Sequence, residues 1–172
     1  SVIGCGPIGL GCTLYLAYAG ARVIAIDVRD ERLRYAKELG AEFIINVVSQ
    51  DAISIVRDIT SGAMSDGVVE ASGRPEGFNL AMQLVGKGGK VACIGENREV
   101  TVNIGQLIRG DITVFGSWYY HRYEYWEMLR LYRRGLDVRK LISHEFKLQE
   151  AQKAFDEFVE GKTAKVILKL WE

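Results

Sequence analysis

The sequence predicts an α/β protein in which a doubly wound, parallel, six-stranded sheet is followed by a smaller C-terminal α/β appendage. Apolar runs of strand length alternate with segments of helical periodicity over residues 1–117. Most of these runs are continuously apolar, which is typical of parallel strands covered on both faces. Alternation of strands and helices favours βαβ units. The pattern changes after residue 117, so we expect two domains, 1–117 and 118–172.

The elements of the first domain follow from apolar runs and from the residues that end them. Strands are expected over 1–4, 22–27, 43–47, 66–71, 90–95 and 112–116. Helices are expected over 8–19, 30–39, 51–60 and 76–86. Gly20 and Gly40 follow the first two helices, where a left-handed residue is favoured. Asp51 or Ser49 is expected to cap the third helix, and the run 86–89 to end the fourth and lead into the fifth strand.

The second domain begins with the aromatic run WYYHRYEYW at residues 118–126. A helix is expected over 124–134, a strand over 144–148, a helix over 149–160 and a last strand over 164–170. Helical spacing puts four apolar side chains of helix 149–160 on one face, namely Ala151, Ala154, Phe155 and Phe158. This tail therefore reads as a unit that packs against another part of a protein.

Composition excludes several classes of protein. The 172 residues are 48% apolar, and 22 basic residues balance 22 acidic ones. A net charge of zero argues against binding to nucleic acid or a membrane surface through bulk charge. No apolar run approaches the roughly 20 residues of a membrane span, and no secretory signal is present.

The cysteines, Cys5, Cys12 and Cys93, are typical of reduced, buried thiols in a cytoplasmic protein. A start inside an apparent strand, without Met, suggests a fragment.

Residues 4–9 (GCGPIG) fit the pattern G-x-G-x-x-G between an apolar strand and a helix. Gly4 permits a tight turn, Gly6 lets the backbone approach a pyrophosphate, and Gly9 allows close packing of the helix. The helix then directs its free N–H groups toward the phosphates. An acid, Asp27, ends the next strand 18 residues after Gly9, close to the roughly 20 expected for this motif. The spacing predicts a dinucleotide site of the Rossmann type.

Asp27 suits both hydroxyl groups of an adenosine ribose and repels a 2′-phosphate, which favours NAD over NADP. Arg29 and Arg32 leave some room for a phosphate there. A strand–helix turn without a ligand is an alternative, as is a methyltransferase that binds S-adenosylmethionine, although the glycine pattern and the tail argue against the latter. A dinucleotide-sensing module without catalysis is a further alternative.

Several segments resemble the medium-chain, zinc-dependent alcohol dehydrogenase family. They include residues 2–10 (VIGCGPIGL), 27–33 (DVRDERL), 36–41 (AKELGA), 66–73 (DGVVEASG), 88–91 (GGKV) with 94–95, and 148–155 with 161–162 and 165–166. The resemblance covers nearly the whole chain and is closest to the polyol and threonine dehydrogenases.

The resemblance implies that NAD is the cofactor, with its ribose held by Asp27 and Arg32. It places the nicotinamide near the carboxyl ends of the fifth and sixth strands, largely against backbone groups. The candidate cofactor-binding residues are Gly4, Gly6, Pro7, Ile8, Gly9, Asp27, Arg32, Ser72, Gly73, Ile94, Gly95, Glu96, Phe115, Gly116 and Ser117. The side chains of Ile94 and Phe115 are equally well explained as core.

The resemblance also implies oxidation of a secondary alcohol to a ketone by hydride transfer to NAD. In this family the zinc ligands and proton relay lie mostly in an amino-terminal domain that this chain lacks, so we expect no catalytic or metal-binding residue here. His121 is expected in an exposed loop and His144 in a structural role. No tyrosine precedes a lysine by four positions, which disfavours the short-chain dehydrogenases. A homodimer through strand 112–116 is also implied, with the tail packed on the catalytic domain.

Overall fold

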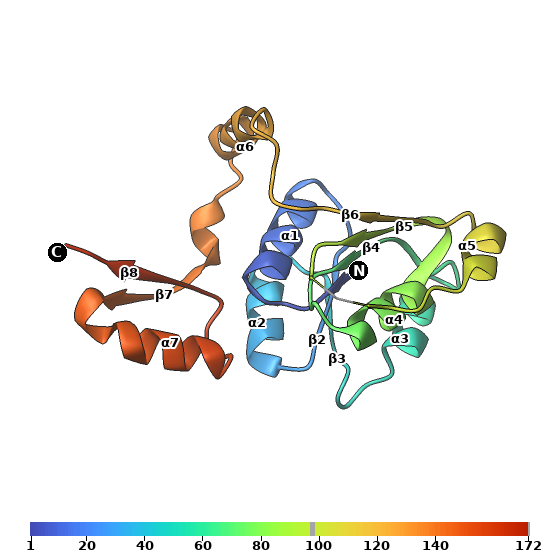
Figure 1. Ribbon diagram of the computed structural model, residues 1–172, viewed down its shortest axis with the longest axis horizontal. Helices are drawn as coiled ribbons and strands as arrows, with labels where there is room; N and C mark the ends of the chain where they lie inside the picture. The colour runs from blue at the N-terminus through green and yellow to red at the C-terminus, as the bar shows by residue number, and fades with distance from the viewer. Residues whose placement is uncertain (97–98, 172) are drawn as a thin grey trace.

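The computed structural model describes residues 1–96 and 99–171 and contains a six-stranded sheet with the order β3-β2-β1-β4-β5-β6. Every neighbouring pair in it is parallel, which confirms the predicted doubly wound α/β architecture (Figure 1). The strands are β1 Val2–Ile3, β2 Ile24–Asp27, β3 Phe43–Asn46, β4 Ser65–Glu70, β5 Val85–Cys93 and β6 Thr113–Gly116. Strand order reverses between β1 and β4, the switch point at which ligands bind in such sheets.

Helices cover both faces of the sheet. They are α1 Pro7–Tyr18, α2 Asp30–Glu38, α3 Ala52–Ile59, α4 Pro75–Leu84 and, after β5, α5 Ile104–Gly110. Side chains of a strand alternate between its faces, and β2 shows this directly. Ile24 and Ile26 belong to the apolar cluster that includes Val56 of α3, whereas Ala25 belongs to the cluster that includes Leu10 of α1. This double burial explains the continuous apolar runs.

The helix ends follow the expected chemistry. Gly20 and Gly40 follow α1 and α2 with φ of +88° and +106°. Asp51 caps α3, because its Oδ1 accepts hydrogen bonds from the backbone N–H groups of Ile53 and Ser54 at 3.0 and 3.3 Å. The alternative cap, Ser49, does not fill this position.

The boundary between α4 and β5 differs from the prediction. The helix ends at Leu84 and β5 begins at Val85, whereas the sequence suggested a helix to 86 and a strand from 90. Val85 pairs with Ser65 and Lys90 with Gly67, so β5 advances by five residues between these two pairs while β4 advances by two. The glycine run absorbs this irregularity, with Gly88 at φ +74°, and it lies within the strand.

Helix α5 is absent from the sequence prediction. Its interior Gly105 lowers helix propensity, and the element is only seven residues long. Asn103 nevertheless caps it by accepting the Gln106 backbone N–H at 3.2 Å. The Gln106 side-chain amide donates to the Met82 carbonyl at 2.6 Å, which anchors the helix to α4.

The segment after β6 forms α6 Glu124–Arg133, a 3₁₀ turn η1 Val138–Leu141, β7 Ile142–Lys147, a 3₁₀ turn η2 Leu148–Glu150, α7 Ala151–Val159 and β8 Lys165–Lys169. Strands β7 and β8 pair in parallel as a separate sheet. β7 starts two residues before the predicted 144, because the preceding 3₁₀ turn ends at Leu141. The last residue of the expected second domain, 172, lies outside the described residues.

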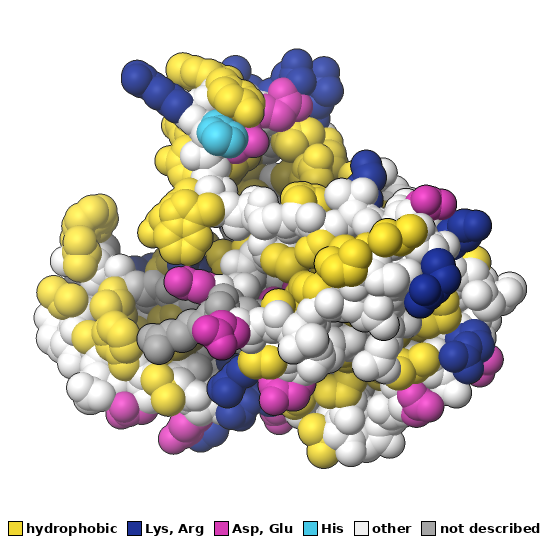
Figure 2. All heavy atoms as spheres, turned by 45° about the vertical axis from the view of Figure 1, so that its right-hand side comes forward, with side chains coloured by type: hydrophobic (Ala, Val, Ile, Leu, Met, Phe, Trp, Pro, Cys, Tyr) yellow, Lys and Arg dark blue, Asp and Glu magenta, His cyan; other side chains and the backbone are white. Residues whose placement is uncertain are grey.

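The apolar face of α7 is only partly covered. Ala154 is buried, whereas the Phe155 side chain is 64% exposed. The segment after β6 also packs against α1, since Leu136 and Ala164 belong to the same apolar cluster as Leu10. Hydrophobic side chains gather on the lobe that carries α6 (Figure 2). Within 1–96 and 99–171, every helix is too short or too polar to span a bilayer.

Candidate functional site

The glycine-rich turn is closely packed at both ends and open in the middle. Gly4 has φ +88°, and a Cβ there would lie 2.7 Å from the Ser72 backbone nitrogen. A Cβ on Gly9 would lie 1.8 Å from the Gly4 carbonyl oxygen, so the turn closes tightly against the start of α1. A Cβ on Gly6 would meet nothing within 4 Å. The turn therefore leaves open space over Gly6, where the motif predicts a pyrophosphate.

The start of α1 has free hydrogen-bond donors. Pro7 is the first residue of the helix, and no side chain caps it. The first N–H groups of a helix lack intrahelical partners, so those of α1 remain available to an anion. The neighbouring Ile8 side chain is 58% exposed.

Asp27 lies at the carboxyl end of β2 and connects that strand to the turn. Its Oδ2 accepts the Cys5 backbone N–H at 2.6 Å, and its Oδ1 accepts those of Val28 and Arg29 at 2.8 and 2.9 Å. The bond to Cys5 was not predicted. A carboxylate offers about four acceptor sites, so three backbone donors leave capacity for a ribose hydroxyl.

The Cys5 thiol is unreactive at neutral pH. Burial, and then the nearby charge of Asp27, raises its pKa to about 12. The thiolate, rather than the thiol, is the nucleophile and metal ligand. Cys5 therefore stays protonated at neutral pH. The side chain of Cys5 is buried as predicted, but those of Cys12 and Cys93 are only half-buried.

Arg32, on α2, has an unsatisfied donor near Cys5. Its Nε is buried and has no hydrogen-bond partner among the described residues. Its charge lowers the pKa of Cys5, which places it near the turn. Buried polar groups nearly always have a partner, so this donor fits an oxygen of a bound ligand.

The loops after β4 and β5 meet the turn at the same edge of the sheet. Gly73 has φ +65°, and a Cβ on Gly95 would lie 2.2 Å from the backbone nitrogen of Gly73. A Cβ on Gly73 would lie 3.3 Å from the Glu96 carbonyl oxygen. With the contact between Gly4 and Ser72, these distances bring the turn, residues 72–73 and residues 94–96 together around the switch point.

Glu70 organises these loops, a role that the sequence analysis missed. This fully buried residue ends β4, and its carboxylate accepts the Ser72 backbone N–H at 2.8 Å and the Ser72 hydroxyl. Its carbonyl oxygen accepts the N–H groups of Ile94 and Gly95, both at 2.9 Å. The sequence did contain a signal for this role, because Glu70 is an acid at the carboxyl end of an apolar strand, as Asp27 is.

The three residues predicted to bind the cofactor at the end of β6 lie in different environments. The Ser117 backbone N–H donates to the Cys93 carbonyl at 3.0 Å, so this segment continues beside β5. Gly116 borders open space. The Phe115 side chain is 45% exposed and lines a cavity with Ser1 and Lys90, so it is not a core residue.

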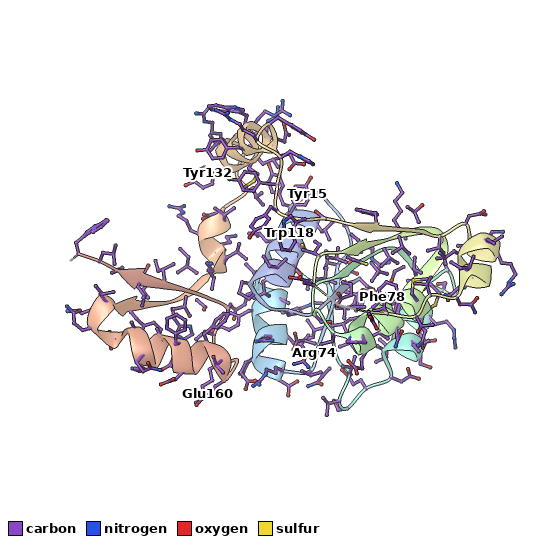
Figure 3. The ribbon with its side chains drawn as sticks, in the orientation of Figure 1. Tyr15, Arg74, Phe78, Trp118, Tyr132 and Glu160 are labelled. Carbon is purple, nitrogen blue, oxygen red and sulfur yellow. The ribbon has the colours of Figure 1, made fainter. Side chains whose placement is uncertain are left out.

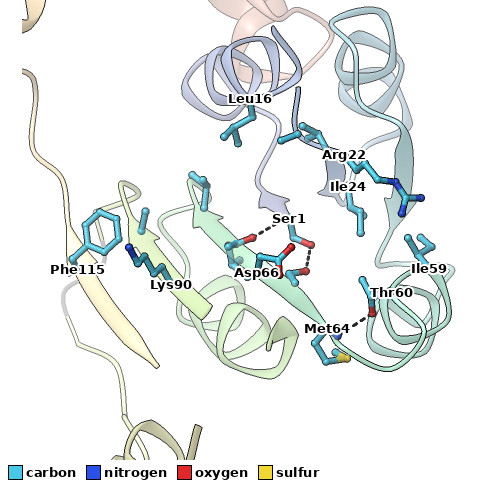
Figure 4. Close-up of a pocket in the computed structure, with 17 residues that line it drawn as sticks. Ser1, Leu16, Arg22, Ile24, Ile59, Thr60, Met64, Asp66, Lys90 and Phe115 are labelled. Carbon is cyan, nitrogen blue, oxygen red and sulfur yellow. Dashed lines mark hydrogen bonds between the residues drawn. The ribbon is translucent and has the colours of Figure 1, made fainter. Parts of the chain in front are cut away.

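That cavity of about 440 Å³ lies around the amino-terminal end of β1 (Figure 4). Ligands of open α/β sheets bind at the carboxyl ends of the strands, so we do not assign the dinucleotide to it. A second cavity, of about 270 Å³, is lined by Pro7, by Phe155 and Phe158 of α7, and by Lys165 of β8. Lys165 thus shares a cavity with the glycine-rich turn, which the sequence did not predict.

The described part of the chain contains no group of three or more His, Cys, Asp or Glu side chains that could hold a metal ion. His121 is exposed and stacks on Tyr123 with ring centroids 5.4 Å apart. His144 is half-buried, and its Nδ1 lies 3.0 Å from the Ser143 hydroxyl oxygen.

Known proteins resemble this chain in sequence and in fold. L-threonine 3-dehydrogenase of Caldanaerobacter subterraneus subsp. tengcongensis is 34% identical over 174 residues, which cover 98% of this chain and 50% of that protein. Alcohol dehydrogenase from Thermus sp. ATN1 superposes with a TM-score of 0.89 at 29% identity, covering 97% of this chain and 50% of that one. A protein from E. coli CFT073 that is described as a short chain alcohol dehydrogenase and is complexed with NADH gives a TM-score of 0.85 at 27% identity, covering 98% of this chain and 51% of that one.

The chain spans about half the length of the curated relatives it matches. The sequence profile described as zinc-binding dehydrogenase matches residues 7–134, most of the chain. These findings confirm the resemblance seen in the sequence, and the chain belongs to the zinc-binding dehydrogenase family.

Proposed function

We propose that this chain is the NAD-binding half of a zinc-dependent dehydrogenase that oxidises a secondary alcohol, such as a polyol, a sugar alcohol or a threonine-like compound, to a ketone. The observation that carries the proposal is the pairing of an open surface over Gly6 with a buried acid, Asp27, held beside it through the Cys5 N–H. A dinucleotide requires both features, one for its pyrophosphate and one for its adenosine ribose.

In this proposal the residues of the crevice bind and orient the cofactor. Asp27 and the free Nε of Arg32 hold the ribose. The uncapped start of α1 holds the pyrophosphate, and Lys165 adds a positive charge across the cavity shared with Pro7. Ser72–Gly73, Ile94–Glu96 and Phe115–Ser117 border the nicotinamide, mainly through backbone groups. When bound, NAD supplies the acceptor for a hydride.

We assign the alcohol and the zinc to the half of the relatives that this chain does not match. Zinc in such enzymes acts as a Lewis acid on an oxygen of the substrate. The described residues supply no cluster of three or more side chains that could hold a metal ion. The chain's contribution is therefore to position the cofactor.

We also propose a homodimer in which two copies of β6 pair in antiparallel fashion. β6 is an outer strand of the sheet. Because the Ser117 N–H donates to Cys93 of β5, and N–H groups alternate along a strand, the N–H groups of Val114 and Gly116 point away from β5. An edge with free backbone groups favours pairing with another strand.

Calorimetric titration of the chain with NAD and NADP tests the cofactor assignment. We expect NAD to bind more tightly. Asp27→Ser should weaken NAD binding by roughly tenfold or more, because hydrogen bonds to charged groups contribute about 1.5–3 kcal/mol and tenfold corresponds to about 1.4 kcal/mol. Tighter binding of NADP than of NAD would refute the assignment.

A further inference from the structure

The side chain of Arg29 is held by the turn that follows α7, although the two are far apart in the sequence. Arg29 Nη1 donates a hydrogen bond to the carbonyl oxygen of Glu160, the residue that directly follows α7 (Figure 3). The Glu160 carboxylate is paired with Lys162 at 2.5 Å. The guanidinium is thus held by the backbone of the turn, through a carbonyl, rather than by an acidic side chain.

Gly161 makes room for this contact. It has φ +74°, and a Cβ there would lie 2.7, 2.8 and 2.9 Å from Nε, Cδ and Cζ of Arg29. Real Cβ atoms do not approach other atoms so closely, so the guanidinium rests on the bare backbone of the glycine. A side chain at residue 161 would displace the arginine.

Arg29 is also next to the acid that we assign to the adenosine ribose. Its backbone N–H donates to Asp27 Oδ1 at 2.9 Å. In dinucleotide sites of this type, an arginine near that acid accommodates the 2′-phosphate of NADP. Arg29 therefore occupies a position from which it could contact such a phosphate, but its guanidinium is turned to the tail.

We propose that the Glu160–Gly161 turn favours NAD over NADP by holding Arg29 away from the ribose, so that the Arg29 guanidinium does not offset the repulsion between the charge of Asp27 and a 2′-phosphate. Arg29 and Gly161 are then specificity-determining positions, linked across the two parts of the chain. This inference rests on the proposed function, because it presupposes a dinucleotide beside Asp27.

Gly161→Ala tests the inference by releasing Arg29. We expect the affinity for NADP to rise about tenfold, the effect of one new hydrogen bond to a charged group, and the affinity for NAD to change less than twofold. Gly88→Ala is the matched control, since Gly88 has the same φ of +74° but no atom within 4 Å of its Cβ position. It should leave the ratio of the two affinities unchanged. In an Arg29→Gln background, Gly161→Ala should also have no effect on that ratio.

Arg29→Gln alone provides a second test that does not depend on the folding of the glycine variant. A tethered Arg29 predicts that the ratio of NADP to NAD affinity changes less than threefold, whereas a tenfold loss of NADP affinity would overturn the inference. An unchanged ratio in folded Gly161→Ala would overturn it too, while normal NAD binding would leave the proposed function standing. Absence of NAD binding by the unmodified chain would instead refute the proposed function, and the inference with it.

Discussion

Replacing Asp27 with asparagine tests whether this residue stabilises the fold as well as a ligand. The amide is nearly isosteric with the carboxylate but has only one acceptor oxygen. If that oxygen keeps the N–H groups of Val28 and Arg29, the amide NH₂ faces the Cys5 N–H, which now lies 2.6 Å from Oδ2. Cys5 is fully buried, so its N–H has no access to water.

The expected loss follows from these three bonds. An unsatisfied buried N–H costs about 1–3 kcal/mol. The two remaining bonds lose the assistance of a full charge, roughly 0.5 kcal/mol each. We therefore expect the free energy of unfolding of cofactor-free Asp27→Asn to fall by about 2–4 kcal/mol. With a slope of about 2 kcal/mol per molar urea, the midpoint should drop by about 1–2 M, measured by circular dichroism.

Asp58→Asn is the matched control, because Asp58 is exposed on α3 and surface substitutions usually change stability by no more than about 0.5 kcal/mol. If the two variants have the same midpoint, Asp27 does not support the glycine-rich turn, and the reasoning about its hydrogen bonds is wrong.

Three other predictions concern assembly, pH and catalysis. Val114→Pro removes an N–H that faces away from β5 and should convert dimers to monomers in light scattering, whereas Val114→Ala should remain dimeric; monomeric unmodified chain at high micromolar concentration would contradict the dimer. Burial raises the pKa of Cys5 to about 12 in the fold, whereas the unfolded thiol keeps its ordinary pKa of 9.0. Between pH 9 and pH 12, unfolding therefore releases a proton. Stability should therefore fall by about 1.4 kcal/mol per pH unit above pH 9, relative to Cys5→Ala, in urea titrations; equal slopes would contradict the burial argument. With zinc, NAD and threonine or polyols, the 172 residues should form no NADH by absorbance, and zinc-dependent formation would reveal a missed catalytic site.

The sequence predicted the sheet and the glycine-rich turn because both depend on local patterns. Continuous apolar runs such as 22–27 follow from burial on both faces, and Gly4 and Gly9 follow from a turn that admits no side chain. Helix α5 was missed because its stability depends on a cap at Asn103 and on the distant bond from Gln106 to Met82. Local propensity cannot report such a contact.

The sequence predicted the segments that form the site, but not the hydrogen bonds that connect these segments. Two hydrogen bonds illustrate this: the Cys5 N–H donates to Asp27, and the Ser72 N–H donates to Glu70. Whether these residues come together depends on strand register. The contact between Arg29 and Glu160 connects positions 131 residues apart. No pattern within one segment of the chain specifies these pairs, because each arises only when the tail and the sheet are assembled.

The double role of Asp27 restricts the mutational routes by which cofactor preference could change in descendants of this protein. A substitution that removes its negative charge also takes the acceptor from the Cys5 N–H, so a gain in NADP use by this route coincides with a loss of stability. Natural proteins lie only slightly above the stability they need. A stabilising substitution elsewhere would have to come first, which makes the order of mutations, as well as their identity, decisive for the outcome.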